Sequence, residues 1–159
     1  MARYDKIDFD FQWTGDIYLG EDGDIKDTSD DQIRSLENEI QSVVKSEFGD
    51  WQAHPTLGAN ISEFKGEANT RELGKRIEER VSLRLTSIGL IQAADLKVKV
   101  LPVTRHEVMI VIQVQASATA QNRLTLGEKV EVKLLYHSME DGMFFLTPSN
   151  QERDFKKGF

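Results

Sequence analysis

The sequence of 159 residues carries 27 acidic and 20 basic side chains, which gives a formal net charge of -7, and 39% of its residues are hydrophobic. A chain of this length can bury one core, so we expect a single domain. The acidic balance argues against a general affinity for nucleic acid or anionic lipid, because both favour a basic surface. The chain has no cysteine, which excludes disulfides, thiolate nucleophiles and cysteine-ligated metal centres.

No stretch of the sequence predicts export or membrane insertion. The opening MARYDKIDFDF lacks the apolar core of a signal peptide. No window approaches the roughly 20 apolar residues of a membrane helix. We therefore expect a soluble protein that is made in a cytoplasm.

The N-terminal segment has the period of a half-buried strand. In KIDFDFQW, polar side chains alternate with apolar ones, which are Ile7, Phe9, Phe11 and Trp13. Ile17 and Leu19 continue this alternation, and the turn-forming GEDG of residues 20–23 precedes Ile25. The sequence therefore predicts a small N-terminal β-hairpin.

The acid-rich run of residues 21–31 does not fit a calcium loop. Lys26, Asp27 and Ile33 stand where that loop requires a third oxygen ligand, a glycine and a bidentate glutamate. We expect no metal site there.

Two amphipathic helices are predicted next. Ser29 and Gln32 form a capping box for the first helix, which we expect over about residues 30–48 with Gly49 as its C-terminal cap. Its apolar stripe is Ile33, Leu36, Ile40, Val43, Val44 and Phe48. The second helix is expected to begin after an N-cap at Asn69 and to reach Gly89. Its stripe is Leu73, Ile77, Val81, Leu85 and Ile88, and its charged residues between 71 and 80 predict a solvated face.

From residue 95 the hydrophobic period falls to two. It predicts a hairpin of residues 96–100 and 108–114, in which Met109 and Val111 indicate a central strand covered on both faces. A third strand is expected from about Lys129 to His137, with inward-facing Val130, Val132, Leu134 and Tyr136, and the MEDG turn of residues 139–142 predicts MFFL as a fourth.

These elements predict an α+β fold. An N-terminal β-hairpin precedes two amphipathic helices, which pack on a three- to four-stranded antiparallel sheet. We expect one domain over residues 1–146 and an extended or disordered C-terminal tail over residues 147–159.

Signals for catalysis are absent. His54, His106 and His137 lie far apart in the sequence and form no zinc-ligand pair. The glycine-rich phosphate loops and the nucleophile elbow are also missing. We therefore expect no catalytic residue and no cofactor. A glycosidase pair of carboxylates stays open, because such a pair is defined by a spatial separation.

The stretch between the two helices, SEFGDWQAHPTLG at residues 46–58, has a distinctive order. A small residue and a glycine precede an acidic residue, a proline follows six positions after the glycine, and a second glycine follows three beyond it; these are Ser46, Gly49, Asp50, Pro55 and Gly58. This order resembles the linker of the baseplate-wedge, or sheath-initiator, family of contractile-tailed bacteriophages. The resemblance extends over about residues 9–116, and the opening is similar to the Mu-like branch. Many members carry a glutamate and an arginine around the proline, whereas here Asp50 replaces the acid and Trp51 and His54 stand near the basic positions.

The resemblance implies a structural virion protein without a catalytic step. In the family, the domain sits at the top of the baseplate around the tail tube, in an assembly made in the host cytoplasm, and six copies in a ring are expected. The linker docks on the helical bundle of the wedge, which would make the wedge-binding residues Gly49, Asp50, Trp51, His54, Pro55 and Gly58.

The sheet of the family accepts extended arms from the first ring of tail sheath subunits. The corresponding sheath-binding residues would be Val130, Val132, Leu134, Tyr136, Phe144 and Phe145. The implied partners are therefore baseplate wedge proteins and the tail sheath protein, with tube or hub proteins nearby, and neither nucleic acid nor membrane is among them.

Two other classes of function stay open. One is a lysozyme-like hydrolase, a label that some members carry, and the other is a generic soluble adaptor outside the virion. Simpler structural roles stay open as well, since Trp51, Pro55 and Leu57 could fold over the helices as a minor core. Likewise, the MFFL strand could simply complete and protect the sheet.

Overall fold

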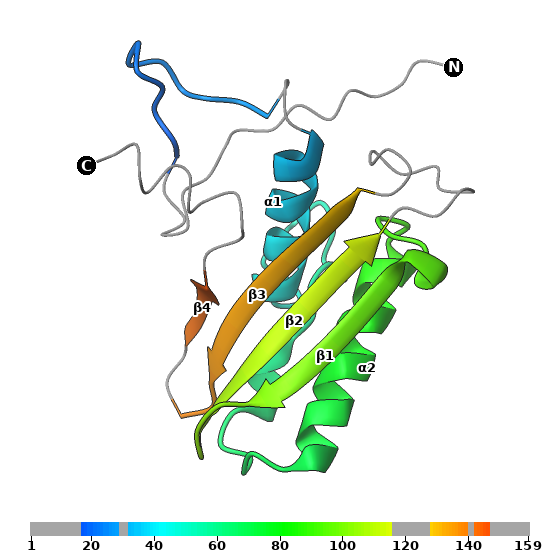
Figure 1. The fold of residues 1–159 in the computed structure, drawn as a ribbon. Coiled ribbons are helices and arrows are strands. Elements are labelled where there is room, and N and C mark those ends of the chain that lie inside the picture. The colour runs from blue at the N-terminus through cyan, green and yellow to red at the C-terminus, as the bar shows by residue number, and fades with distance from the viewer. Residues whose placement is uncertain (1–16, 29–31, 116–127, 140–141, 147–159) are drawn as a thin grey trace.

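The computed structural model describes residues 17–28, 32–115, 128–139 and 142–146. It contains α1 (Gln32–Lys45), α2 (Arg71–Ser87), β1 (Leu96–Pro102), β2 (Glu107–Gln115), β3 (Lys129–His137) and β4 (Gly142–Leu146). Short 3₁₀ turns at Ile61–Phe64 and Ala93–Asp95 precede α2 and β1. Figure 1 shows both helices on one face of an antiparallel sheet with the strand order β1-β2-β3-β4. The predicted α+β class is confirmed.

The core lies between the two helices and the sheet. Along β2 and β3 every second side chain is buried, as the period of two predicts. The inward side chains are Val108, Ile110, Ile112, Val114, Val130, Val132, Leu134 and Tyr136. They meet the helix stripes, whose buried members are Leu36, Ile40, Val43, Val44, Leu73, Ile77, Val81 and Leu85. Burial of these side chains is the main stabilising contribution.

The first helix is shorter than predicted. It ends at Lys45, so Phe48 lies beyond the helix, and the Phe48 side chain is 43% exposed. Gly49 does adopt a left-handed conformation, with φ of +91°, but within the following loop and not as a helix cap. The predicted cap residue Ser29 lies outside the described residues.

The N-cap of the second helix is Thr70, not Asn69. The Thr70 side chain accepts a hydrogen bond from the Leu73 N–H at 3.1 Å. The Asn69 side chain instead donates to the carbonyls of Thr104 and Glu107, at 2.7 and 3.1 Å, and so ties the start of the helix to the β1–β2 turn. The helix ends at Ser87, and Ile88, predicted on the stripe, is 42% exposed.

Among the described residues, neither helix covers the second face of the sheet. Met109 and Val111 are only partly buried on the face opposite the helices. Within the described ranges, both helices lie on the other face (Figure 1). The prediction that β2 is covered on both faces is therefore wrong for the described part of the chain.

Little of the N-terminal prediction can be followed in the described residues. Leu19 and Ile25 form an isolated antiparallel bridge around the turn that contains Gly23, and both side chains are exposed. The predicted strand at residues 7–13 and the tail at residues 147–159 lie outside the described residues. Among the helices that the structure describes, none is long and apolar enough to span a membrane.

The two faces of β2 offer a matched test of this packing. We expect Ile112→Ala to lower the free energy of unfolding by about 2–5 kcal/mol, because the Ile112 side chain is fully buried beneath the helices. The neighbouring Val111→Ala, on the open face, should cost about 1 kcal/mol or less. Urea denaturation of both variants measures the difference. Equal losses would contradict an open face.

Candidate functional site

The candidate site is the linker loop, residues 46–60, which joins the end of α1 to the 3₁₀ turn before α2. Its closure depends on a few backbone contacts. The Gly49 N–H donates to the Pro55 carbonyl at 2.9 Å, so the intervening residues form a closed turn. The Asp50 carboxylate accepts from the Glu47 N–H at 2.8 Å, which fixes the entry into that turn. The loop therefore has a defined shape of its own.

Gly58 lies where the two ends of the loop meet. Its φ is +130°, and a Cβ atom at this position would stand 2.4 Å from the Ser46 carbonyl oxygen. No larger residue fits that approach without displacing the backbone. Ser46 also binds across the loop, since its hydroxyl accepts from Trp51 Nε1 at 3.0 Å and donates to the Ser42 carbonyl.

The five positions that carry the family resemblance thus all take part in closing the loop. The backbones of Ser46 and Gly58 meet where the loop closes, and Gly49 adopts the left-handed conformation of the turn. Asp50 supplies the capping carboxylate, and Pro55 supplies the carbonyl that accepts from the Gly49 N–H. The resemblance assigned Gly49 and Gly58 to wedge binding. In the structure both glycines have a positive φ and shape the backbone of the loop.

The outer side of the loop presents aromatic and polar side chains. Trp51 is 49% exposed and Phe48 is 43% exposed, and His54 and Pro55 are exposed as well. Of the loop residues proposed as a minor core, only Leu57 packs partly against the main core. Trp51 and Pro55 therefore do not fold over the helix stripes.

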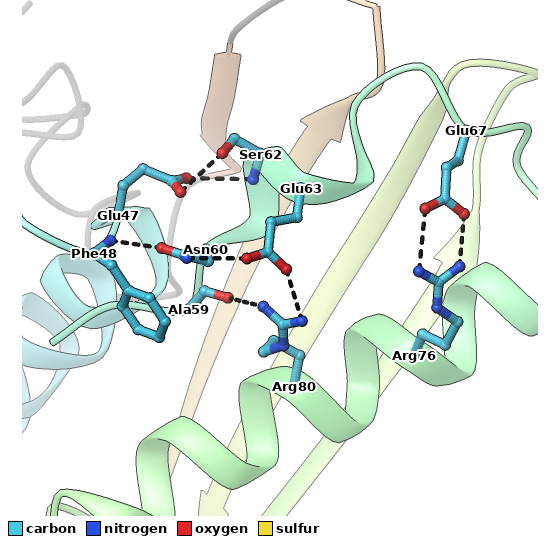
Figure 2. A network of polar contacts seen from close by, with 9 residues as sticks. All are labelled: Glu47, Phe48, Ala59, Asn60, Ser62, Glu63, Glu67, Arg76 and Arg80. Carbon is cyan, nitrogen blue, oxygen red and sulfur yellow. Dashed lines mark hydrogen bonds and ion pairs between the residues drawn. The ribbon is translucent and has the colours of Figure 1, made fainter. Parts of the chain in front are cut away.

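A network of polar contacts holds the loop against α2 (Figure 2). Asn60, with a left-handed φ of 51°, accepts from the Phe48 N–H at 2.6 Å and donates to Glu63 at 3.2 Å. Glu63 in turn accepts from Arg80 of α2 at 2.9 Å, and Arg80 also donates to the Ala59 carbonyl at 3.4 Å. On the other side of the loop, the Glu47 carboxylate accepts from both the N–H and the hydroxyl of Ser62.

Arginines of α2 also contact two aromatic rings of the linker region. The Arg84 guanidinium lies 4.4 Å from the centroid of the Phe48 ring. The guanidinium groups of Arg76 and Arg80 lie 5.0 and 5.3 Å from the centroid of the buried Phe64 ring. Such cation–π contacts favour a fixed ring position.

Sequence reasoning missed this use of the arginines. It assigned Arg76 and Arg80 to a solvated face, but Arg76 pairs with Glu67 through both guanidinium nitrogens, at 2.7 and 3.1 Å, and Arg80 reaches the loop. The signal in the sequence was the regular four-residue spacing of Arg76, Arg80 and Arg84, on a helix that follows a loop with aromatic residues. In this structure α2 supplies guanidinium groups to the linker region from the side.

The inward residues of β3 cannot form a partner surface with their side chains. Val130, Val132, Leu134 and Tyr136 are at most 5% exposed, and β3 lies between β2 and β4. Their assignment as sheath-binding residues is therefore corrected to core residues. Phe144 and Phe145 belong to β4, where the backbone register places them opposite Leu135 and Leu134.

A partner strand could join the described sheet only at an outer strand, and β1 is one of these. The Val100 N–H points away from β2, since it donates to the Glu78 carboxylate at 2.9 Å. Beside this edge, a groove of about 450 Å³ is lined by residues of α2, the preceding loop and β1; they are Asn69, Thr70, Arg71, Gly74, Lys75, Glu78, Val100 and Pro102.

The histidines do not form a metal centre in the described part of the chain. His106 and His137 approach each other, with ring centroids 6.4 Å apart, at the end of the sheet near the β1–β2 turn. His54 lies on the linker loop. No group of three or more metal-ligating side chains occurs among the described residues.

Comparison with known proteins adds no relative. The chain matches no protein-family model, no curated protein and no solved structure.

The two linker glycines provide a paired test of loop closure. We expect Gly58→Ala to lower the free energy of unfolding by about 2 kcal/mol or more, because the methyl group would meet the Ser46 carbonyl in a strained conformation. Gly49 also has a positive φ, but no atom lies within 4 Å of the methyl group that Gly49→Ala would add. This substitution should therefore lower the free energy of unfolding by only about 1 kcal/mol. Thermal or urea unfolding measures both losses. A loss at Gly49 equal to or above that at Gly58 would contradict the assigned crossing point.

The contact between Arg80 and Glu63 predicts a pH dependence. The hydrogen bond from Arg80, followed by that from Asn60, holds the pKa of the Glu63 carboxyl below its usual value. A lowered pKa in the folded state means that Glu63 stabilises the protein above the usual pKa and that this contribution is lost as the pH falls through the lowered value. The relevant window lies below about pH 4.3, the usual pKa of glutamate.

Arg80→Gln should raise the Glu63 pKa toward its usual value in an NMR titration. The loss of stability below about pH 4.3 should become smaller in this variant, because the preferential stabilisation of the ionised form is reduced. Arg71→Gln, at an exposed position of the same helix, is the matched control and should leave the Glu63 pKa unchanged. An unchanged pKa in both variants would rule out the assigned cause.

Proposed function

We propose that this protein is a structural component of a contractile phage-tail baseplate, where it links the wedge to the first ring of sheath subunits. The linker loop docks on the wedge, and an outer strand of the sheet accepts an extended sheath arm. The protein acts by assembly alone, without a catalytic step or a cofactor. It belongs to the virion and joins the baseplate in the host cytoplasm, in a ring of six copies.

The linker loop is the observation that supports this proposal. The residues that carry the resemblance to sheath initiators are the ones that close the loop, and the side chains left on its outer side include Trp51 and Phe48. Aromatic side chains supply a large share of the free energy of many protein interfaces. A loop that is already ordered loses less conformational entropy on binding. The loop thus combines an exposed aromatic anchor with a fixed backbone.

The sheath contact is proposed to use backbone atoms. Strand addition needs unpaired N–H and C=O groups at an outer strand, and side-chain alternation then sets the register. The inward side chains of β3 are not required for this, since they stabilise the sheet on which the arm would add. In this proposal β4 acts as a genuine fourth strand, so that β4 and β1 are the two outer strands of the sheet.

Cross-linking mass spectrometry on purified contractile particles that contain this chain tests the proposal directly. We expect cross-links from residues 50–58 to a wedge protein and cross-links from the sheet to sheath subunits. Absence of the chain from intact particles would contradict the proposal and favour an adaptor outside the virion. Peptidoglycan hydrolysis that is lost on neutralising a single carboxylate would instead identify a hydrolase.

Trp51→Ala gives a quantitative version of this test. We expect this variant to bind the wedge protein at least about 10-fold more weakly, because a buried aromatic anchor contributes about 2 kcal/mol or more to an interface. Leu83→Ala removes a 60% exposed apolar side chain from α2 and serves as the control, with unchanged affinity. Isothermal titration calorimetry with isolated wedge protein measures both affinities, and equal affinity of the Trp51 variant and the wild type would exclude docking through this loop.

A further inference from the structure

The outer edge of β1 has the backbone geometry of an acceptor for another strand. The Val103 N–H donates to the Glu107 carbonyl of the neighbouring strand, whereas the Val100 N–H donates to the Glu78 carboxylate. Because backbone groups alternate in direction along a strand, Leu96 and Val98 share the outward direction of Val100. In the described sheet no strand lies beyond β1. The edge therefore presents backbone donors and acceptors, with a carboxylate holding one of the donors.

The side chains next to this edge define what kind of strand fits. Lys97 and Lys99 are exposed on the open face of the sheet, and neither has an ion-pair partner among the described residues. On the helix-covered face, the groove of about 450 Å³ leaves room beside Val100 and Gly74. Arg71 and Lys75 line this groove, and their guanidinium and ammonium groups can contact aromatic rings.

An added strand should therefore alternate between acidic and apolar side chains. Acidic side chains would lie beside Lys97 and Lys99 on the open face, where opposite charges on adjacent strands attract each other. Aromatic or branched side chains would enter the groove on the other face. A strand with basic or uniformly polar side chains meets neither requirement.

The chain itself contains such a segment. Residues 7–13, IDFDFQW, place Asp8 and Asp10 on one parity and apolar side chains on the other, namely Ile7, Phe9, Phe11 and Trp13. This is the segment predicted to be a strand, and it lies outside the described residues. Its pattern complements both faces of the β1 edge.

We propose that the β1 edge accepts residues 7–13 of a second copy of this chain. Figure 1 shows residues 17–28 on the β3–β4 side of the molecule, across the sheet from β1. The four Cα–Cα steps from residue 13 to residue 17 can span at most about 14 Å. The distance from β4 to a strand added beyond β1 is about 19 Å, at the usual spacing of neighbouring strands. Docking within one chain is therefore disfavoured.

In the added state, a backbone carbonyl of the incoming strand replaces the Glu78 carboxylate at the Val100 N–H. One hydrogen-bond acceptor is exchanged for another, and the released carboxylate becomes solvated. The donor segment and the acceptor edge are different surfaces, so two copies can exchange segments reciprocally in a dimer, or successive copies can join head-to-tail in a closed ring or an open filament. This inference concerns contacts between copies of the chain and does not require a wedge or a sheath partner.

Disulfide trapping in the full-length protein tests the proposal, because the chain has no cysteine of its own. One population carries Asp8→Cys or Asp10→Cys, and a second, differently tagged population carries Lys97→Cys or Lys99→Cys. Under mild oxidation we expect a mixed disulfide in at least one of the four combinations, since opposed residues on adjacent strands approach within disulfide distance. Lys133→Cys on the same open face, two strands away, is the matched control and should give at least 10-fold less product.

Three trapping outcomes would overturn the proposal. One is equal product with the Lys133 control, which would indicate random collision. Another is a disulfide within a single chain when one chain carries Asp10→Cys and Lys99→Cys at low concentration, which would place the segment on its own sheet. Absence of mixed product in all four combinations also overturns it.

Charge exchange provides a second measurement that does not depend on oxidation. In sedimentation velocity, K97E/K99E should lower the fraction of assembled chains at least several-fold, and D8K/D10K should do the same. Combining all four substitutions in one chain should restore assembly, because the attraction between the two strands is restored with reversed signs. Failure of the combined variant to recover, while it remains folded by circular dichroism, would overturn the proposal.

Discussion

The packing of two helix stripes on one face of a single sheet is the constraint on which the rest of this molecule depends. Both helices must lie on the same face, because only that face presents fully buried branched side chains on β2 and β3. The chain between Lys45 and Arg71 therefore has to pass from one helix to the other at the border of the core. It does so with three buried contacts, at Ala59, Ile61 and Phe64, and the preceding residues are left to form a loop outside the core.

The same constraint explains which parts of the fold were predictable. A period of two marks β2 and β3, and the expected third strand agrees with the observed Lys129–His137, because alternation is a local property of the sequence. The errors arise where contacts link distant residues. Phe48 could continue the α1 stripe by spacing alone, but its N–H binds Asn60, 12 residues later, and its ring lies beside Arg84. Asn69 has the composition of an N-cap, yet its amide is used 35 residues away at the β1–β2 turn.

The candidate site shows a similar division. The order of glycine, acid and proline pointed to residues 46–58 as a unit, but the physical reason for Gly58 is its approach to the Ser46 carbonyl, which depends on the path of the chain in three dimensions. The alternation of β3 predicts that Val130, Val132, Leu134 and Tyr136 face inward, and their burial confirms it. Their assignment to sheath binding followed from the resemblance and not from the period of the strand, and the burial of these side chains rules it out.

The linker loop and the β1 edge differ in the contacts that their neighbouring basic residues make. Three arginines on α2 contact aromatic rings, and two of them, Arg76 and Arg80, also bind Glu67 and Glu63. A planar guanidinium can stack and donate several hydrogen bonds at once. Lys97 and Lys99 at the β1 edge have no such partner among the described residues. Partner binding through the linker loop should therefore depend on aromatic burial and change little with salt. Strand binding at the β1 edge combines backbone pairing with exposed charge, so it should weaken as the ionic strength rises. On a chain of net charge -7, the exposed Lys97 and Lys99 at this edge favour an acidic strand over a basic one.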